Sequence, residues 1–401
     1  MTSSLKKLAG LLVLAASCCA IAQAAPLTIL VSIDGMRPDY LERGVTPHLN
    51  RLAARGARAL AMRPSFPSLT FPNHYTLVTG LRPDRHGVVG NNMDDAAIPG
   101  VRFSLDNEAA VTDRRWWDQA EPVWVTAELH RIRAGTLFWP GSEAAIHGVR
   151  PTAAPPFDGK QPAVARVDRL LSWLGRSDAK ALGFATLYLD DVDHAGHTFG
   201  PDAGQTTRAV ARVDESIGRL LDGLAKRRLD FNIVIVSDHG MAPTSAERMV
   251  RMDRLLPEGS YNKVASGSYA GLEPVAGHED ELAAALLKPH AHMQCWRKGE
   301  IPARLAYGRN VRVPAFICLA ETGWLLAFND KAMPRGGAHG YDNAAPEMGA
   351  IFIAAGPAIK PGVVLPVFDN VDVYPLLMRL LQLTPLPSDG DIAPLLPALA
   401  P

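Results

Sequence analysis

LTILVSID, from Leu27 to Asp34, is a mostly apolar run of strand length that ends at a carboxylate. Such a run is typical of a strand that is buried on both faces, as in a parallel sheet. Phe184–Leu189 and Ile233–Val236 have the same character, and each leads into acidic and imidazole side chains. The three segments therefore predict the centre of a mainly parallel sheet.

Segments with helical signals alternate with these strand-like runs. Thr46-Pro47 has the pattern of a helix N-cap followed by proline at the first helical position. Residues 204–226 carry apolar side chains at helical spacing. Further predicted elements are helices over Pro47 to Gly56, Thr70 to about Gly80 and Val371–Leu381, and strands over Ala57–Met62 and Ala350–Ala354. This alternation predicts an α/β fold with a doubly wound, mostly parallel sheet flanked by helices.

The region from about 245 to 335 breaks the alternation with turn residues and short strand-like stretches. We interpret it as a smaller β-containing insertion or cap. The proline-rich stretch from Pro151 to Pro162 is too short to link independent domains. Residues 25–401 are therefore expected to form one domain that carries the insertion.

Composition indicates a globular protein with a large core. The chain has 401 residues, of which 47% are hydrophobic and 20% are charged, and its formal net charge is zero. A neutral chain without basic runs lacks the bulk charge that holds polyanions, so we expect no sequence-specific nucleic acid partner. No feature of the sequence indicates an oligomeric state.

The N-terminus has the pattern of a secretory signal peptide over residues 1–24. Lys6 and Lys7 precede the apolar stretch Leu8–Ile21, and Ala22-Gln23-Ala24 supplies a cleavage site after Ala24. A membrane anchor is the alternative, but the stretch is short for a spanning helix. A lipoprotein site at Cys18 is disfavoured by its neighbouring residues. A periplasmic or secreted mature protein follows, and no other segment has the apolar length of a membrane span.

Two cysteines remain in the mature chain, Cys295 and Cys318. An even pair in an exported protein indicates a disulfide. Two buried free thiols are the alternative.

Polar side chains of one chemical kind follow the predicted strands. Ligands bind outside the carboxyl ends of the strands in open α/β sheets, so these side chains should meet at one edge. Carboxylate and imidazole together suit zinc, and six such groups suffice for two ions, which can clamp the attacking and leaving oxygens of a phosphoryl transfer. The six residues are Asp34, Asp193, His197, Asp238, His239 and His339. Single residues of this kind are more often turn or surface residues, and the repetition favours a metal site.

Thr70 is the candidate nucleophile. A threonine hydroxyl is weak at its own pKa, but a metal ion lowers that pKa. The helix expected to begin at Thr70 would aim its backbone N–H groups at a phosphate. The alternative is that Thr70 only caps this helix.

These residues belong to a longer series of motifs. In this order and over most of the mature chain, the series resembles the nucleotide pyrophosphatase/phosphodiesterases of the alkaline phosphatase superfamily, and especially the compact bacterial members. The motifs are Asp34-Gly35-Met36-Arg37, Thr70-Phe71-Pro72-Asn73-His74-Tyr75, Thr79-Gly80-Leu81-Arg82-Pro83, Asn91-Asn92-Met93, Trp139-Pro140-Gly141-Ser142-Glu143, Asp193-His194-Ala195-Gly196-His197, Ser237-Asp238-His239-Gly240-Met241 and His339-Gly340-Tyr341-Asp342-Asn343.

The resemblance implies an alkaline phosphatase-like core, a single catalytic domain and a role for each residue. One Zn²⁺ would be held by Asp193, His197 and His339. The other would be held by Asp34, Asp238 and His239 and contacted by Thr70. Asn91 would donate a hydrogen bond to a phosphate oxygen and so stabilise the transition state.

The implied reaction is the hydrolysis of nucleotide phosphodiester or pyrophosphate bonds. A phosphothreonine forms on Thr70, and a nucleoside 5′-monophosphate is released. Phe71 is expected to stack on the base of a small-molecule nucleotide substrate. Phe157 stands where relatives usually have a second stacking aromatic, most often tyrosine, and this departure keeps the ring but loses a hydroxyl. Either phenylalanine could instead be a core residue.

Two other functions remain open. A relative that cleaves choline phosphodiesters or lysophospholipids would need a cation-binding aromatic or acidic pocket, which the sequence does not locate. A non-catalytic, exported zinc-binding protein would need neither Thr70 nor Asn91.

Overall fold

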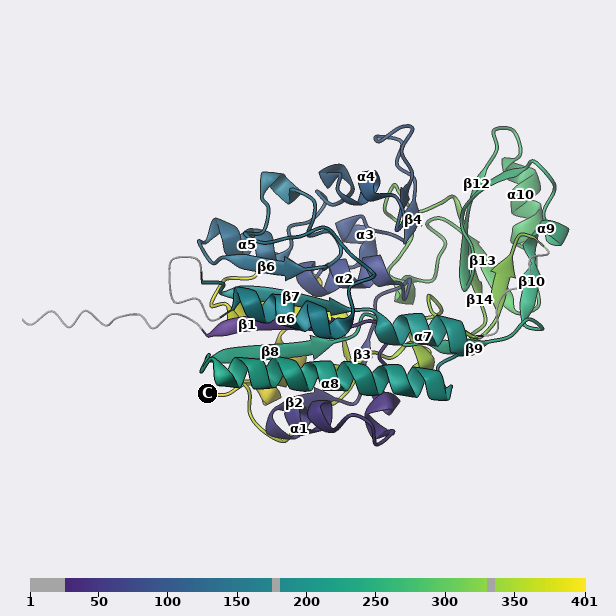
Figure 1. Ribbon diagram of the computed structural model, residues 1–401. Helices are drawn as coiled ribbons and strands as arrows, with labels where there is room; N and C mark the ends of the chain where they lie inside the picture. The colour runs from purple at the N-terminus through teal and green to yellow at the C-terminus, as the bar shows by residue number, and fades with distance from the viewer. Residues whose placement is uncertain (1–25, 175–180, 330–335) are drawn as a thin grey trace, which may run out of the picture.

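The computed structural model describes residues 26–174, 181–329 and 336–401, and Figure 1 shows a twisted central sheet covered by helices on both faces. The predicted signal peptide over residues 1–24 lies outside the described residues. The central sheet has seven strands, which are, across the sheet, β18 (Val363–Leu365), β2 (Ala57–Ala59), β17 (Phe352–Ala355), β8 (Phe231–Val236), β1 (Leu27–Ile33), β7 (Phe184–Leu189) and β6 (Ala134–Leu137).

The predicted α/β fold with a mostly parallel sheet is confirmed, with one strand reversed. β1 runs parallel to β7 and β8, and β6–β7 and β18–β2 are also parallel. β17 is antiparallel to both β8 and β2. It also begins two residues later than predicted, at Phe352. The strand predicted over Ala57–Met62 is two short strands, β2 and β3 (Met62–Arg63), in different sheets.

Side chains of β1 alternate between the two faces of the sheet. Ile29, Val31 and Ile33 pack in one hydrophobic cluster with helices α1 (Pro47–Arg55), α6 (Ala163–Trp173) and α8 (Gly204–Lys226). Leu30 packs in the opposite cluster with α2 (Thr70–Thr79), α5 (Val123–Leu129) and α11 (Val373–Leu380). Both faces of the strand are therefore buried, as its apolar run predicted.

The predicted helices form at the predicted places. α1 ends before Gly56, and α8 has the predicted bounds. α2 ends at Gly80, whose φ of +65° is a left-handed conformation that glycine adopts without strain. The closing helix α11 follows a short 3₁₀ turn, Asn370–Asp372.

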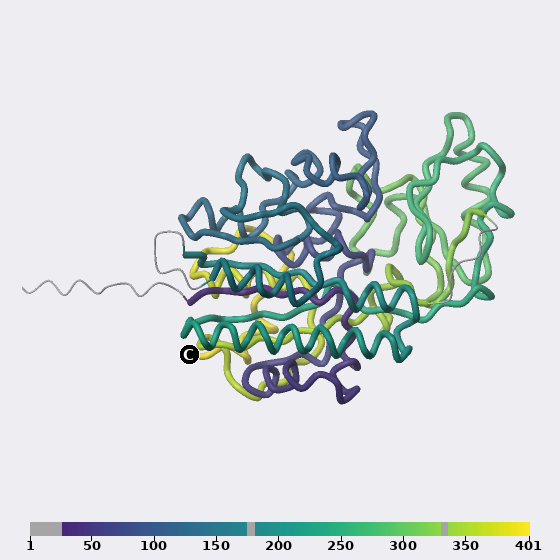
Figure 2. The backbone as a smooth tube through the Cα atoms, in the orientation of Figure 1, coloured from purple at the N-terminus to yellow at the C-terminus, as the bar shows by residue number. Residues whose placement is uncertain are grey.

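A second, antiparallel sheet lies within the region predicted as an insertion. Its four strands are, in order, β11 (Tyr261–Ala265), β12 (Tyr269–Pro274), β14 (Phe316–Ala320) and β13 (Met293–Arg297). Figure 2 shows this lobe beyond the carboxyl ends of β1 and β8. Neighbouring elements are α9 (Met252–Leu255), α10 (Glu279–Leu286), β10 (Met249–Arg251) and β15 (Leu325–Ala327). Residues 330–335 of the predicted insertion lie outside the described residues.

Short elements complete the described chain. They are α3 (Pro83–His86), α4 (Glu108–Val111), α7 (Asp191–Phe199), β4 (Asn92–Met93), β5 (Phe103–Ser104), β9 (Ala242–Thr244), β16 (Gly336–Ala338) and β19 (Phe368–Asp369). Within the described ranges, none of the helices has both the length and the apolar character needed to cross a membrane.

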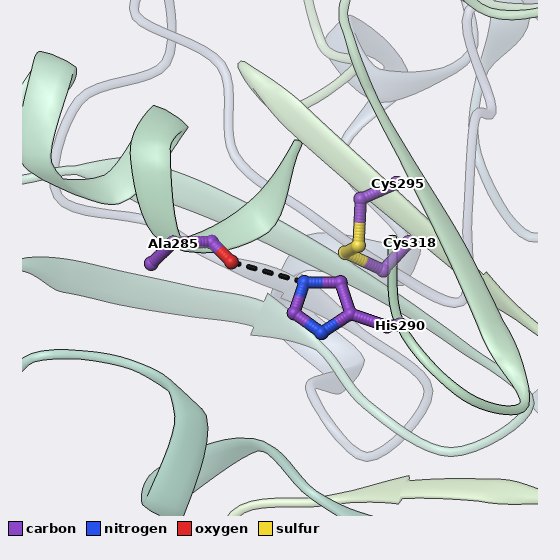
Figure 3. Close-up of a disulfide and its surroundings, with 4 residues drawn as sticks. All are labelled: Ala285, His290, Cys295 and Cys318. Atoms are coloured by element: carbon purple, nitrogen blue, oxygen red, sulfur yellow. Dashed lines mark hydrogen bonds between the residues drawn. A yellow bond between two sulfur atoms is a disulfide. The ribbon is translucent and has the colours of Figure 1, made fainter. Parts of the chain in front are cut away.

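Cys295 and Cys318 form the predicted disulfide. The two residues lie directly opposite each other on the antiparallel strands β13 and β14. Figure 3 shows the bond beside His290, whose Nε2 donates a hydrogen bond to the carbonyl of Ala285 at 2.9 Å. The disulfide therefore joins two strands within the second sheet.

We expect the combined substitution Cys295→Ala and Cys318→Ala to lower the free energy of unfolding of the second sheet by about 3 kcal/mol. The disulfide closes a loop with a sequence separation of 23 residues, and its loss gives the unfolded chain more freedom. Urea unfolding of both proteins measures the difference. A thiol reductant should shift the wild type toward the variant and leave the variant unchanged. Equal midpoints for the two proteins without reductant would contradict the prediction.

Candidate active site

The carboxyl ends of three adjacent strands, β8, β1 and β7, create the edge at which the predicted site residues meet. Asp34 directly follows β1, and its N–H donates to the carbonyl of Leu189 at the end of β7. Asp238 and His239 follow β8. Asp193 lies in the first turn of α7, which begins just after β7.

Asp34, Asp238 and His239 form one group of potential metal ligands. All three are buried, and their ligand atoms lie within 4.8 Å of one another. His239 Nε2 is 2.9 Å from Asp238 Oδ2 and 3.5 Å from Asp34 Oδ1. The remaining carboxylate oxygens have donors, since the Tyr188 hydroxyl donates to Asp34 Oδ2 at 2.6 Å and the Gly35 N–H donates to Asp238 Oδ1 at 3.3 Å.

Asp193 and His339 form a second group, in which His239 also takes part. His339 Nε2 is 3.6 Å from Asp193 Oδ1. His197 adjoins this group from the next turn of α7, with its Nε2 at 3.5 Å from Asp193 Oδ1 and 3.1 Å from His339 Nε2. The structure thus brings five of the six sequence-predicted ligands into two groups that share His239, and it places His197 beside the second group.

The imidazole rings are oriented by the backbone. The Nδ1 atoms of His197, His239 and His339 each lie 2.9 Å from a carbonyl oxygen, those of Gly337, Gly240 and Ser68 respectively. A carbonyl can only accept, so each Nδ1 carries the hydrogen and each Nε2 faces the site. Backbone hydrogen bonds of this kind orient metal-binding histidines in proteins.

The charges of the site call for cations. Burial lowers the pKa of His339 well below its usual range, and the neighbouring histidines lower it further, so its ring is neutral. Its bare Nε2 then faces His197 Nε2 at 3.1 Å. Burial also raises the pKa of Asp34 well above its usual range, and the charges of Asp238 and Asp193 add to that effect. A positive ion among these groups would relieve both conflicts.

Unsatisfied oxygen atoms mark where such ions would fit. Among the described residues, nine buried side-chain polar atoms have no hydrogen-bond partner. Three of them are Asp34 Oδ1, Asp193 Oδ1 and Asp238 Oδ2, which all face the site. Buried polar atoms are rarely left without partners. Aspartate oxygen and histidine nitrogen are ordinary ligands of Zn²⁺, so the donor set fits zinc ions.

Thr70 lies beside these groups as the first residue of α2. Its Oγ1 is 3.3 Å from His239 Nε2, and the residue is 8% exposed. The N-cap of α2 is Leu69, so the alternative of Thr70 as the N-cap is wrong. His74 supports this turn, because its Nδ1 donates to the carbonyl of Thr70 and its Nε2 accepts from the Ser32 hydroxyl, both at 2.8 Å.

Asn91 is held by the same helix start. Its Oδ1 accepts a hydrogen bond from the backbone N–H of Phe71 at 3.0 Å. The oxygen is therefore engaged, and the amide NH₂ group is the end that remains to donate. A donor next to a candidate nucleophile is suited to hold a phosphate oxygen.

Both sequence-predicted aromatic residues open onto one cavity of about 430 Å³, which Asp34, Thr70 and Asp193 also line. Phe71 packs edge-on against Phe103, with ring centres 5.7 Å apart. Phe157 is 49% exposed, so it is not a core residue. A cavity that joins aromatic rings to the metal-ligand groups has the form of a substrate pocket.

Sequence reasoning missed several residues of this pocket. Tyr188 bonds Asp34, and Phe138, Trp139, Glu143 and His194 line the cavity. Trp139 and Glu143 belong to one of the sequence motifs, but no function was predicted for either residue. Nothing local marks Tyr188, which is one position in an apolar strand.

Known proteins resemble this chain in sequence over most of its length. The family described as Type I phosphodiesterase / nucleotide pyrophosphatase matches residues 28–342. An uncharacterized pyrophosphatase/phosphodiesterase of Schizosaccharomyces pombe is 36% identical over 386 residues, which cover 92% of this chain and 79% of that protein. Human ectonucleotide pyrophosphatase/phosphodiesterase family member 1 is 34% identical, but the chain spans only 41% of its length.

The fold agrees with these sequence matches. The structure of murine ectonucleotide pyrophosphatase/phosphodiesterase 5, an inactive threonine-to-alanine variant in complex with AMP, superposes with a TM-score of 0.90 and 33% sequence identity. The superposition covers 94% of this chain and 100% of the murine chain. The core is alkaline phosphatase-like, as predicted, and the chain belongs to the type I phosphodiesterase / nucleotide pyrophosphatase family of hydrolases.

Proposed function

We propose that the chain hydrolyses nucleotide phosphodiester or pyrophosphate bonds with two Zn²⁺ ions, through a phosphothreonine on Thr70, and releases a nucleoside 5′-monophosphate. The observation that carries the proposal is the position of Thr70 Oγ1, 3.3 Å from His239 Nε2, beside both groups of ligands. The complex of a 33% identical murine relative with AMP supports a nucleotide substrate. We also propose that residues 25–401 act as one exported catalytic domain.

The proposed ligand sets follow the sequence motifs. Asp193, His197 and His339 would hold one Zn²⁺, and Asp34, Asp238 and His239 would hold the other, with Thr70 beside it. His239 lies within reach of both groups. When bound, the two ions would lower the pKa of the attacking hydroxyl or water and balance the charge on the attacking and leaving oxygens.

The chain's own residues account for the two chemical steps. Thr70 Oγ attacks phosphorus in line and loses its proton to solvent, a P–Oγ bond forms, and the bond to the leaving oxygen breaks. Water then attacks the phosphothreonine from the vacated side, the P–Oγ bond breaks, and a proton from water restores the Thr70 hydroxyl. Asn91 donates its amide hydrogen to a non-bridging oxygen in both steps, and the N-terminal turn of α2 favours the negative charge that develops there.

A choline phosphodiester is a second candidate substrate, and one observation favours it. The cavity lining contains aromatic rings together with the carboxylates of Asp106, Glu108, Glu143 and Asp190, and no lysine or arginine is among its described residues. Such a lining suits a quaternary ammonium group. A non-catalytic zinc-binding protein is disfavoured, because it would need neither Thr70 Oγ1 at the ligand groups nor a hydrogen-bonded Asn91.

A comparison of three substrates tests the proposal. We expect a nucleotide aryl diester to be cleaved with the highest kcat/KM, an aryl phosphocholine more slowly and an aryl monoester least. Removal of metal by a chelator should abolish all activity, and added zinc should restore it, because the buried carboxylate oxygens of the ligand groups need a bound cation to balance their charge. Release of the aryl group measures each rate. Faster turnover of the phosphocholine would favour a choline phosphodiester as the substrate. Zinc binding without any turnover would favour a non-catalytic zinc-binding protein.

The nucleophile is tested by Thr70→Ala. We expect diester hydrolysis to fall at least about 1,000-fold, as for other nucleophiles in covalent catalysis, while the zinc content is unchanged. Thr152→Ala, at an exposed threonine, is the matched control and should behave as the wild type. Rates are measured with the nucleotide aryl diester, and zinc is measured by elemental analysis. A variant that retains normal rates would remove Thr70 from this role.

Base stacking is tested by Phe71→Ala. A base–aromatic stack contributes about 1–3 kcal/mol, so we expect KM for nucleotide diesters to rise roughly 5- to 150-fold. A small aryl diester without a base should show little change. Steady-state kinetics with both substrates make the comparison. Equal effects on the two substrates would mean that Phe71 does not stack on a base.

A further inference from the structure

Arg166, on α6, is a charged residue in the interior of the protein. Its side chain is only 1% exposed. A buried charge is costly unless it is paired and hydrogen-bonded. The contacts of Arg166 therefore indicate what its position serves.

The guanidinium group of Arg166 ties together three segments. Its Nε donates to the carbonyl of Gln161 at 2.8 Å, in the loop before α6. Its Nη1 donates to the carbonyl of Tyr188 at 3.1 Å, near the end of β7. The same Nη1 lies 3.0 Å from Asp190 Oδ1, and Asp190 is the N-cap of α7, which carries Asp193.

The guanidinium group also lies over two aromatic rings. Arg166 Cζ is 5.2 Å from the ring centre of Phe138 and 5.6 Å from that of Phe157. The two rings pack edge-on with centres 5.4 Å apart. Phe138 has a φ of +66°, a left-handed conformation that is strained in a non-glycine residue and persists only where the surroundings enforce it. The surroundings thus hold this aromatic pair in place.

These contacts lie directly behind the proposed substrate pocket. Phe138, Phe157, Tyr188 and Asp190 all line the cavity, whereas Arg166 does not. Phe157 is half exposed and belongs to a loop, and Phe138, Tyr188 and Arg166 are among the residues that contact its ring.

We propose that Arg166 is a positioning residue that fixes the Phe157 wall of the pocket and thereby sets the affinity for substrates with a stackable base. This inference rests on the proposed function. Lysine would keep the charge at this position but lose the planar group that lies over two rings while it donates to two carbonyls. The ring of Phe157 would then be free to leave its position, and binding of the base would weaken.

A double-mutant cycle with Arg166→Lys and Phe157→Ala tests this role. In Arg166→Lys we expect KM for the nucleotide aryl diester to rise about 5- to 10-fold, with kcat and the KM of a small aryl diester within about 2-fold. In the Phe157→Ala background, the same lysine substitution should change KM less than about 2-fold, because the ring through which Arg166 acts is absent. Arg219→Lys, at the exposed ion pair with Asp168, is the matched control.

The contrary results are equally specific. An equal loss with both diesters, or the same loss with and without Phe157, would mean that Arg166 only stabilises the fold. If Arg166→Lys does not fold, Asp190→Asn is the second variant. It removes the negative charge that pairs with the Arg166 guanidinium, and Asp190 is partly exposed. It should raise the nucleotide KM at least about 2-fold only when Phe157 is present. Unchanged KM in Asp190→Asn would overturn the proposal.

The dissociation constant for AMP is measured in parallel for every variant. AMP needs no turnover, so the same cycle can be read even if the wild type cleaves neither diester and the proposed function fails. If Arg166→Lys weakens AMP binding when Phe157 is present but not in the Phe157→Ala background, the result supports the positioning role of Arg166. AMP affinity that is the same in all four proteins, or absent from the wild type, overturns it.

Discussion

Three carboxylates, those of the buried Asp34 and Asp238 and of the partly buried Asp193, meet at one end of the central sheet, and the site depends on the compensation of their charge. Burial disfavours each charge, and their mutual repulsion adds to the cost, so the pKa of Asp34 is raised. Hydrogen bonds satisfy one oxygen of Asp34 and one of Asp238, and leave the others directed at the same space. The order β8-β1-β7 imposes this arrangement, because it makes the three strand ends neighbours.

The sequence predicted the centre of the fold well because parallel strands are buried on both faces. β1, β7 and β8 are therefore mostly apolar runs that stand out without any knowledge of their partners. The direction of β17 was not predictable in this way, since the path of its connection decides whether it pairs antiparallel with β8. The break between β2 and β3 likewise reflects pairing with different strands, β17 and β19, rather than a local signal.

The site was predictable for a different reason. Its ligands follow strand ends, so motif and position agreed, and the structure brings those residues together. Arg166 and Tyr188 were missed because their roles come from contacts between distant segments. Arg166 occupies a helix position where a long charged side chain is usually solvated, and its contacts with distant segments, such as the rings of Phe138 and Phe157 and the carbonyl of Tyr188, reveal its function in packing.

The metal-ligand groups and the aromatic wall share one support at the end of β7. The hydroxyl of Tyr188 donates to Asp34, while its carbonyl accepts from Arg166, which in turn contacts Phe157. A change at Tyr188 would therefore disturb both the charge balance of Asp34 and the shape of the pocket. Phe157 is half exposed on a loop and is not one of the candidate metal ligands. Its ring can therefore be substituted while the three carboxylates stay in place. Substrate preference is thus freer to vary at the loop than at the strand that joins the two parts of the site.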